Sequence, residues 1–158
     1  MSRAHTPWSE ARAREIIEAL AAVEGALLPV LHALQAEFGW VSDEAVALAA
    51  EVLNLSRAEA HGTVTFYHDF RRAPTPRHVL KLCRAEACQA RGGRAVEARA
   101  QAALGVEMGE TRADGAVALE AAYCLGLCAS GPAAMLDGRP MARLAGARLE
   151  ALLAEAQA

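Results

Sequence analysis

Apolar residues recur at the spacing of an α-helix through roughly the first 70 residues of the chain. Positions three and four residues apart share one face of a helix, so each stripe predicts an amphipathic helix whose apolar side faces a core. The first stripe consists of Ala13, Ile16, Ile17 and Leu20, the second of Leu27, Leu31, Leu34 and Phe38, and the third of Val46, Ala49 and Leu53.

Residues that favour helix ends flank these stripes. The segment Thr6-Pro7 predicts the start of the first helix, because threonine caps helices and proline fits the first helical position. Gly39 is a typical stop for the second helix, and Ser42 is a typical cap for the third, which we expect to end at Asn54. Residues 56–59, Ser-Arg-Ala-Glu, form a capping box that opens a fourth helix. The sequence therefore predicts an N-terminal helical bundle.

The pattern changes at Pro74-Thr75-Pro76, because two prolines in three residues cannot continue a helix and mark a linker. We therefore expect the helical bundle to occupy residues 1–73 and a second domain to occupy residues 74–158. Short runs in the second part alternate or are continuously apolar, which is typical of strands. The predicted strands are residues 78–82, 117–123, 133–137 and 139–142.

Turn and helix signals complete the second part. Asp114-Gly115 predicts a turn, and Asp137-Gly138 predicts a tight hairpin between the last two strands. Helices are expected from Gly92-Gly93 to Leu104 and around the apolar residues 149, 152 and 153. Helices and strands in separate runs predict an α+β protein.

All four cysteines of the chain follow two of these predicted strands. Cys83 and Cys88 form a C-x4-C pair after strand 78–82, and Cys124 and Cys128 form a C-x3-C pair after strand 117–123. If the two strands are neighbours in one sheet, both pairs reach the same edge, an arrangement that resembles the thioredoxin-like fold. Four thiols at one edge would form a pocket suited to a soft metal centre.

The composition fits a globular protein without membrane insertion or nucleic-acid binding. Of 158 residues, 54% are hydrophobic and 22% are charged, which allows a buried core. The net charge is −3 and the basic residues are scattered, so no patch would follow a phosphate backbone. No run approaches the roughly 20 apolar residues of a membrane span, and no signal-peptide pattern opens the chain. We expect a cytoplasmic protein, in which cysteine pairs are more often metal ligands or redox groups than disulfides.

The residues alone leave several interpretations of the cysteines open. Neighbouring thiolates repel one another unless a cation lies between them, and either a structural zinc ion or a 2Fe–2S cluster would supply it. In the cluster interpretation, Cys83 and Cys88 would ligate one iron, and Cys124 and Cys128 the other. The zinc interpretation corresponds to an interaction module without redox function. A disulfide or thiol oxidoreductase is a further alternative, although neither pair has the C-x-x-C spacing.

Residues around the cysteines bear on this choice. Gly126 and Gly131-Pro132 let the backbone turn sharply and direct N–H groups toward sulfur. Arg84, Arg91 and Arg94 could offset the negative charge of a cluster, or could be solvated surface side chains. The sequence has no P-loop, no dinucleotide fingerprint and no nucleophile with a base, so the isolated chain is not expected to be an enzyme.

Two motifs combine with the cysteine spacing to resemble one family. They are Cys124-Leu125-Gly126-x-Cys128 and residues 61–68, His-Gly-Thr-Val-Thr-Phe-Tyr-His. The family is the thioredoxin-like 2Fe–2S subunit of NADH dehydrogenases, which accompanies the flavin subunit of respiratory complex I. The resemblance implies a helical bundle followed by a thioredoxin-like 2Fe–2S ferredoxin domain. It also implies one 2Fe–2S cluster held by Cys83, Cys88, Cys124 and Cys128.

Within that family, the chain is most similar to the gamma subunit of cytoplasmic NAD-dependent, molybdenum-containing formate dehydrogenase. Residues 61–71 and 81–90 carry this similarity, including Arg84-Ala85-Glu86-Ala87 where complex I relatives usually have Gly-Thr-Ala. The resemblance implies a non-catalytic electron-transfer subunit with two partners: a flavin- and NAD-binding diaphorase subunit and a molybdenum-containing large subunit that oxidises formate. An NAD-reducing hydrogenase and complex I itself are alternative parent complexes.

Overall fold

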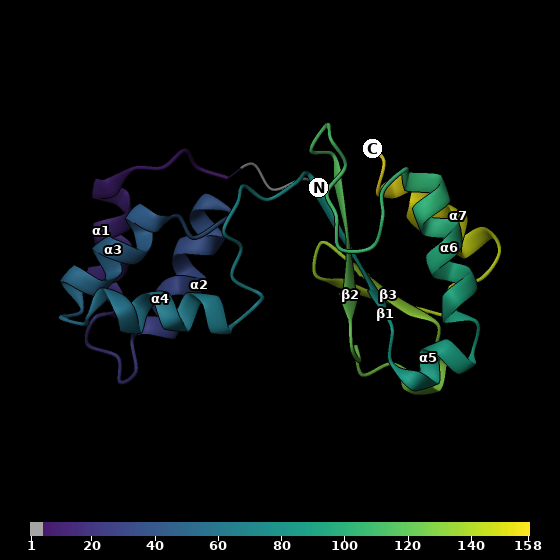
Figure 1. The fold of residues 1–158 in the computed structure, drawn as a ribbon, viewed down its shortest axis with the longest axis horizontal. Coiled ribbons are helices and arrows are strands. Elements are labelled where there is room, and N and C mark those ends of the chain that lie inside the picture. The colour runs from purple at the N-terminus through teal and green to yellow at the C-terminus, as the bar shows by residue number, and fades with distance from the viewer. Residues whose placement is uncertain (1–4) are drawn as a thin grey trace. The chain divides into compact units, whose positions relative to one another are not determined.

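The computed structural model describes residues 5–158 and contains two compact units, the first ending at Thr75 and the second beginning at Pro76. The first unit consists of helices α1 (Glu10–Leu20), α2 (Leu27–Phe38), α3 (Asp43–Val52) and α4 (Arg57–Phe66) (Figure 1). The predicted N-terminal helices are therefore present. Their apolar stripes meet in one buried cluster whose largest fully buried side chains include Ile17, Leu31 and Leu34.

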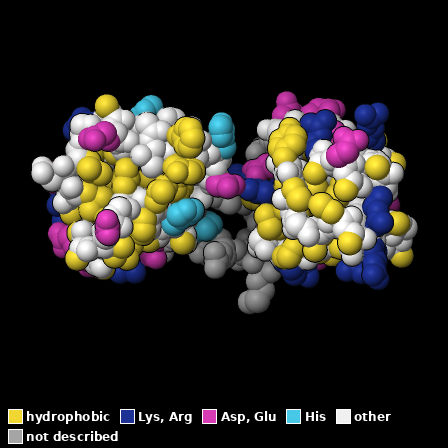
Figure 2. Space-filling model, turned by 90° about the horizontal axis from the view of Figure 1, so that it is seen from below, with side chains coloured by type: hydrophobic (Ala, Val, Ile, Leu, Met, Phe, Trp, Pro, Cys, Tyr) yellow, Lys and Arg dark blue, Asp and Glu magenta, His cyan; other side chains and the backbone are white. Residues whose placement is uncertain are grey.

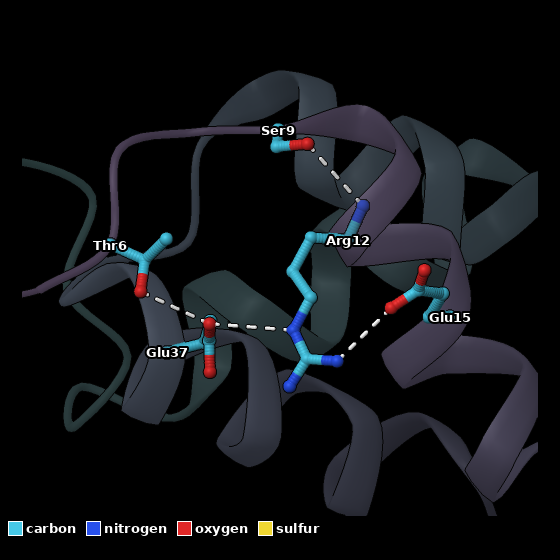
Figure 3. A network of polar contacts seen from close by, with 5 residues as sticks. All are labelled: Thr6, Ser9, Arg12, Glu15 and Glu37. Atoms are coloured by element: carbon cyan, nitrogen blue, oxygen red, sulfur yellow. Dashed lines mark hydrogen bonds and ion pairs between the residues drawn. The ribbon is translucent and has the colours of Figure 1, made fainter.

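The first helix begins later than the sequence predicts. Thr6 is not its cap: the helix starts after Ser9, whose hydroxyl accepts a hydrogen bond from the Arg12 amide at 3.4 Å. The Thr6 hydroxyl donates instead to the Glu37 carboxylate on α2 at 3.1 Å, and the Arg12 guanidinium reaches the same oxygen (Figure 3). The Trp8 ring packs on α2, 5.0 Å from the Phe38 ring. These contacts hold residues 6–8 against α2. The segment therefore does not form an additional turn of α1.

The other helix ends agree more closely with the sequence. Gly39 ends α2 in the left-handed conformation, at φ 83°, which favours glycine. Ser42 caps α3 by accepting from the Ala45 amide, although the helix ends at Val52, before the predicted Asn54. At α4 the capping box is complete, because the Ser56 hydroxyl accepts from the Glu59 amide and the Glu59 carboxylate accepts from the Ser56 amide.

The second unit contains one four-stranded sheet with the order β2-β1-β3-β4. The strands are β1 (His78–Cys83), β2 (Val117–Ala122), β3 (Ala133–Leu136) and β4 (Arg139–Ala142). Strands β1 and β2 pair in parallel, whereas β3 is antiparallel to both β1 and β4. Helices α6 (Gly93–Leu104) and α7 (Ala147–Glu155) cover one face of this sheet (Figure 1). The predicted α+β class is confirmed.

Side chains on β1 alternate between the two faces of the sheet. Leu80 and Leu82 are buried against α6 and α7, within the core of this unit. Lys81 points to the other face, where its ammonium lies 3.7 Å from the Glu120 carboxylate on β2. No helix among the described residues is both long enough and apolar enough to cross a membrane.

The hairpin and the end of β2 illustrate where local signals succeed and fail. Asp137 and Gly138 both have positive φ, 50° and 83°, as the tight turn between β3 and β4 requires. Asp137 also accepts a hydrogen bond from the Val79 amide and pairs with the buried His78 ring at 2.7 Å. The predicted strand 117–123 ends one residue early, so Tyr123 is not part of β2. It is 76% exposed and lies beyond the last strand residue, Ala122.

The capping box gives a testable contribution to stability. Replacing Ser56 with Ala removes the acceptor for the Glu59 amide, which should lower the free energy of unfolding by about 1 kcal/mol. Hydrogen bonds from Ser56 also hold the pKa of Glu59 below its usual range. The stability that the Glu59 carboxylate contributes is therefore lost as the pH falls and the carboxylate becomes protonated. Thermal unfolding followed by circular dichroism at neutral pH measures the change. The Ser56→Thr variant, which keeps the hydroxyl, should unfold near wild type; equal destabilisation in both variants would contradict this role.

Candidate metal centre

Parallel pairing of β1 and β2 brings the two cysteine segments to one edge of the sheet. In the register of the two strands, Cys83 is opposite Ala122, and Cys124 follows Ala122 by two residues. The Arg84 amide extends the pairing by donating to the Ala122 carbonyl at 2.7 Å. The prediction that both cysteine pairs leave neighbouring strands at the same edge is therefore confirmed.

The first pair is buried. Cys83 is the last residue of β1, and Cys88 lies in the short helix α5 (Glu86–Ala90), which the sequence did not predict. Their exposed fractions are 4% and 1%. Burial follows from the apolar residues packed around the two thiols, which are Ala85, Leu125, Leu127 and Ala133.

The second pair lies on an exposed, irregular segment. Cys124 Sγ and Cys128 Sγ are 3.6 Å apart, and both residues are exposed. Cys124 has φ 125°, in the region that L-residues rarely adopt, and Gly126 follows at φ 75°. This turn directs the Gly126 amide to Cys124 Sγ at 3.4 Å. Cys128 begins the single turn of 3-10 helix Cys128–Ser130.

Contacts between the two segments hold the pairs together. The backbone at Cys124 and Leu125, on the second segment, lies close enough to the Cys83 thiol on the first to lower the pKa of that thiol. Gly131, after the second pair, packs against Cys88 so closely that a Cβ atom there would lie 3.1 Å from Cys88 Sγ. The four thiols therefore belong to one site assembled from both segments.

The surroundings act differently on the thiols. Burial raises the pKa of Cys83, but hydrogen bonds from the Ala85 amide, from Cys88 and from the second segment lower it overall. For Cys88, burial and the neighbouring Cys83 thiol raise the pKa. For Cys128, the Cys124 thiol raises the pKa. Each pair therefore resists carrying two negative charges at once, as neighbouring thiolates do without a cation between them.

This donor set fits a 2Fe–2S cluster. A cluster of that type takes four thiolates, and the four thiols here form two pairs on facing segments with backbone N–H groups directed at sulfur. Among residues 5–158, no group of three or more His, Cys, Asp or Glu side chains is arranged to hold a single metal ion. All four cysteines are free thiols, and the 3.6 Å between Cys124 and Cys128 is far longer than a disulfide bond.

Sequence reasoning missed part of the support around this site. It left residues 86–90 without an element, because helix α5 is too short to show a periodic pattern. It identified Gly131 as a turn residue, whereas the structure shows contact with Cys88. Of the three arginines considered, Arg84 forms an ion pair with Glu97, and Arg91 donates to the Ala129 carbonyl.

Proteins of known sequence match most of this chain. Residues 13–157 match the family described as thioredoxin-like [2Fe-2S] ferredoxin. The chain is 36% identical over 112 residues to a subunit of the NADH-quinone oxidoreductase of Pseudomonas aeruginosa, covering 71% of this chain and 68% of the relative. The corresponding subunit of the Escherichia coli K12 oxidoreductase is 34% identical over the same shares.

A solved structure is similar in fold as well. The chain superposes on part of an NAD+-reducing [NiFe]-hydrogenase, crystallised in the air-oxidised state, with a TM-score of 0.73 and 30% identity. The similarity covers 83% of this chain but only 22% of the hydrogenase chain. These relationships favour the 2Fe–2S cluster over the zinc ion that the cysteine spacing left open. The chain belongs to the thioredoxin-like [2Fe-2S] ferredoxin family, and its cofactor is one 2Fe–2S cluster.

Proposed function

We propose that the chain is the one-electron-transfer subunit of an NAD-linked oxidoreductase, with Cys83, Cys88, Cys124 and Cys128 as the cluster ligands. The observation that carries this proposal is the meeting of two thiol pairs at the β1–β2 edge. Two thiolates from each segment match the two cysteine ligands that each iron takes. Both the NADH-quinone oxidoreductase subunits and the NAD+-reducing hydrogenase named above belong to NAD-linked oxidoreductases.

The protein contributes ligation, shielding and orientation, while a bound 2Fe–2S cluster supplies reversible one-electron chemistry. The buried thiols of Cys83 and Cys88 limit water access on one side, since packed apolar side chains surround them. Backbone amides near Cys83 favour its thiolate form. The Gly126 amide directed at Cys124 Sγ would favour the more negative charge of a reduced site. The chain presents no catalytic group of its own in this proposal, so substrate chemistry belongs to its partners.

The parent complex that we propose is a cytoplasmic, NAD-dependent, molybdenum-containing formate dehydrogenase. Support comes from the sequence similarity of residues 61–71 and 81–90, including Arg84-Ala85-Glu86-Ala87 between the first two cysteines. Arg84, the first residue of this segment, forms a 3.1 Å ion pair with Glu97 next to the site. The segment that replaces Gly-Thr-Ala therefore makes a specific contact in this chain. A complex I or NAD-reducing hydrogenase parent is the second candidate, favoured by the relatives themselves. Co-purification of the chain at its native level, with formate- and hydrogen-dependent NAD reduction assayed on the isolated complex, separates the two.

The helical unit is proposed to dock on the flavin- and NAD-binding partner. An open groove of about 820 Å³ lies between the α1–α2 loop and the end of α4, lined mainly by apolar side chains. Phe66, which is 73% exposed, and Tyr67, which is 45% exposed, border it. Hydrophobic side chains gather on the face of this unit seen in Figure 2. Exposed aromatic side chains beside an apolar groove are typical of protein interfaces.

The cluster itself is tested on the purified chain. Under anaerobic purification, we expect a red-brown protein with two iron atoms per chain, visible bands that bleach with dithionite, and a rhombic EPR signal after reduction. Cys88→Ser and Cys128→Ser should each lose most of this signal, because each removes one thiolate ligand. Tyr123→Phe, next to Cys124, serves as the control. A colourless protein containing one zinc ion per chain would contradict the proposed function.

Close packing between Gly131 and Cys88 gives a second test. In Gly131→Ala, the added methyl would lie 3.1 Å from Cys88 Sγ and must displace either the thiol or the loop. We expect a lower iron content and an altered EPR spectrum. Gly62→Ala makes the same chemical change on α4, where nothing lies within 4 Å, and should leave both unchanged. Equal iron content and identical spectra in the two variants would show that this contact does not constrain the ligand.

Docking by the helical unit predicts a change in assembly. Phe66→Asp places a carboxylate on the exposed aromatic surface and should weaken co-purification with the NAD-binding partner by at least tenfold, equivalent to about 1.4 kcal/mol. Ala58→Asp introduces the same group at the exposed first turn of α4, outside the groove, and should assemble normally. Iron content of both variants confirms that the cluster unit is intact. Full assembly of Phe66→Asp would contradict this docking surface.

A further inference from the structure

Arg91 links the two segments that carry the cysteines. It directly follows α5, and its amide donates to the Cys88 carbonyl at 3.2 Å. Its guanidinium reaches across to the second segment, where Nη1 donates to the Ala129 carbonyl at 2.8 Å. Ala129 comes immediately after Cys128. The Arg91 side chain therefore connects the end of α5, which contains Cys88, to the residue after Cys128. The two connected residues, Arg91 and Ala129, are 38 positions apart in the sequence.

The stem of Arg91 takes part in the same contact. At Gly131, the position of a Cβ atom would lie 3.5 Å from Arg91 Cδ and 3.1 Å from Cys88 Sγ. The backbone at Gly131 thus packs against both the arginine side chain and the buried thiol. Because the hydrogen bond and this packing act on the same short loop, they fix the distance between the Cys128 segment and α5.

Arg91 differs from Arg84 and Arg99 in the group that it contacts. Arg84 pairs with Glu97, and Arg99 forms two hydrogen bonds to the Glu150 carboxylate on α7. Within the described part of the chain, Arg91 forms no ion pair with a carboxylate; its partner is a neutral carbonyl. Its positive charge is therefore not neutralised locally, and it lies at the junction of the two cysteine segments.

We propose that Arg91 is a positioning residue for the cluster, which ties the Cys128 loop to the Cys88 helix and leaves an uncompensated positive charge beside the ligands. This proposal rests on the proposed function, since it assumes that the four cysteines hold the cluster. Loss of the tie would loosen one ligand segment, and outer contacts of this type commonly change metal affinity by about 10- to 100-fold. Loss of the charge would make reduction of the cluster less favourable, because reduction adds a negative charge.

Three variants of the full chain distinguish the two proposed roles of Arg91, which are its link between the cysteine segments and its positive charge. Arg91→Gln removes the charge, Arg91→Lys keeps the charge without the planar fork, and Arg99→Gln is a matched loss of one cation at α6. Cluster loss to a chelator is followed by visible absorption, and the midpoint potential is measured by EPR-monitored redox titration. Wild-type iron content and EPR, measured first, test the proposed function separately.

We expect Arg91→Gln to lose its cluster roughly tenfold faster than wild type and to have a more negative potential. Arg91→Lys should lose its cluster faster than wild type while its potential stays near the wild-type value. Arg99→Gln should match wild type in both. If Arg91→Gln purifies without a cluster yet melts like Arg99→Gln, the positioning role is supported, and the potential of Arg91→Gln after its cluster is reconstituted tests the charge. A wild-type spectrum together with unchanged loss rate and potential in Arg91→Gln would overturn the proposal while leaving the proposed function intact.

Discussion

Backbone pairing between β1 and β2 is the constraint on which the metal centre depends. The strands are parallel over six residue pairs, from His78 opposite Val117 to Cys83 opposite Ala122. Because side chains alternate along a strand, a slip of one residue would move Leu80 and Leu82 out of the core. The apolar core therefore fixes the register, and the register fixes where each cysteine segment leaves the sheet. The burial of apolar side chains in this unit therefore determines where the sulfur atoms lie.

Placement alone would not make the thiols a stable site, because neighbouring thiolates repel one another. The fold meets this repulsion with backbone dipoles: amides of the second segment reach Cys83, and the Gly126 amide reaches Cys124. Burial and the neighbouring Cys83 thiol still raise the pKa of Cys88, and the Cys124 thiol raises the pKa of Cys128. In the proposed site, a cationic centre between the pairs would remove the remaining repulsion, so metal binding and the packing of the two segments would stabilise each other.

The sequence predicted the parts of this structure that depend on local pattern. The stripes of α2, the capping box at Ser56 and the hairpin turn at Asp137 each have short-range physical causes, and each is present. Thr6 failed as a cap because Trp8 packs on α2, a tertiary contact that no local signal reports. The cysteine spacing indicated a shared site, but helix α5 and the contact of Gly131 with Cys88 could not be inferred. Both depend on segments that meet only after the sheet has formed.

The backbone at Cys124 shows how strain is accommodated at this site. A non-glycine residue at φ 125° costs on the order of 1–3 kcal/mol, and it persists only where surrounding contacts leave no alternative. Strand β2 fixes the chain before Cys124. After it, the Arg143 amide holds the Ser130 carbonyl at 2.8 Å and the Leu144 amide holds the Pro132 carbonyl at 3.1 Å. The segment is thus anchored at both ends, so an exposed loop with only one turn of 3-10 helix can present two thiols in one fixed arrangement. Relaxing Cys124 to an ordinary conformation would release the strain but break the amide–sulfur contacts that the turn creates, which is why the strain belongs to the site.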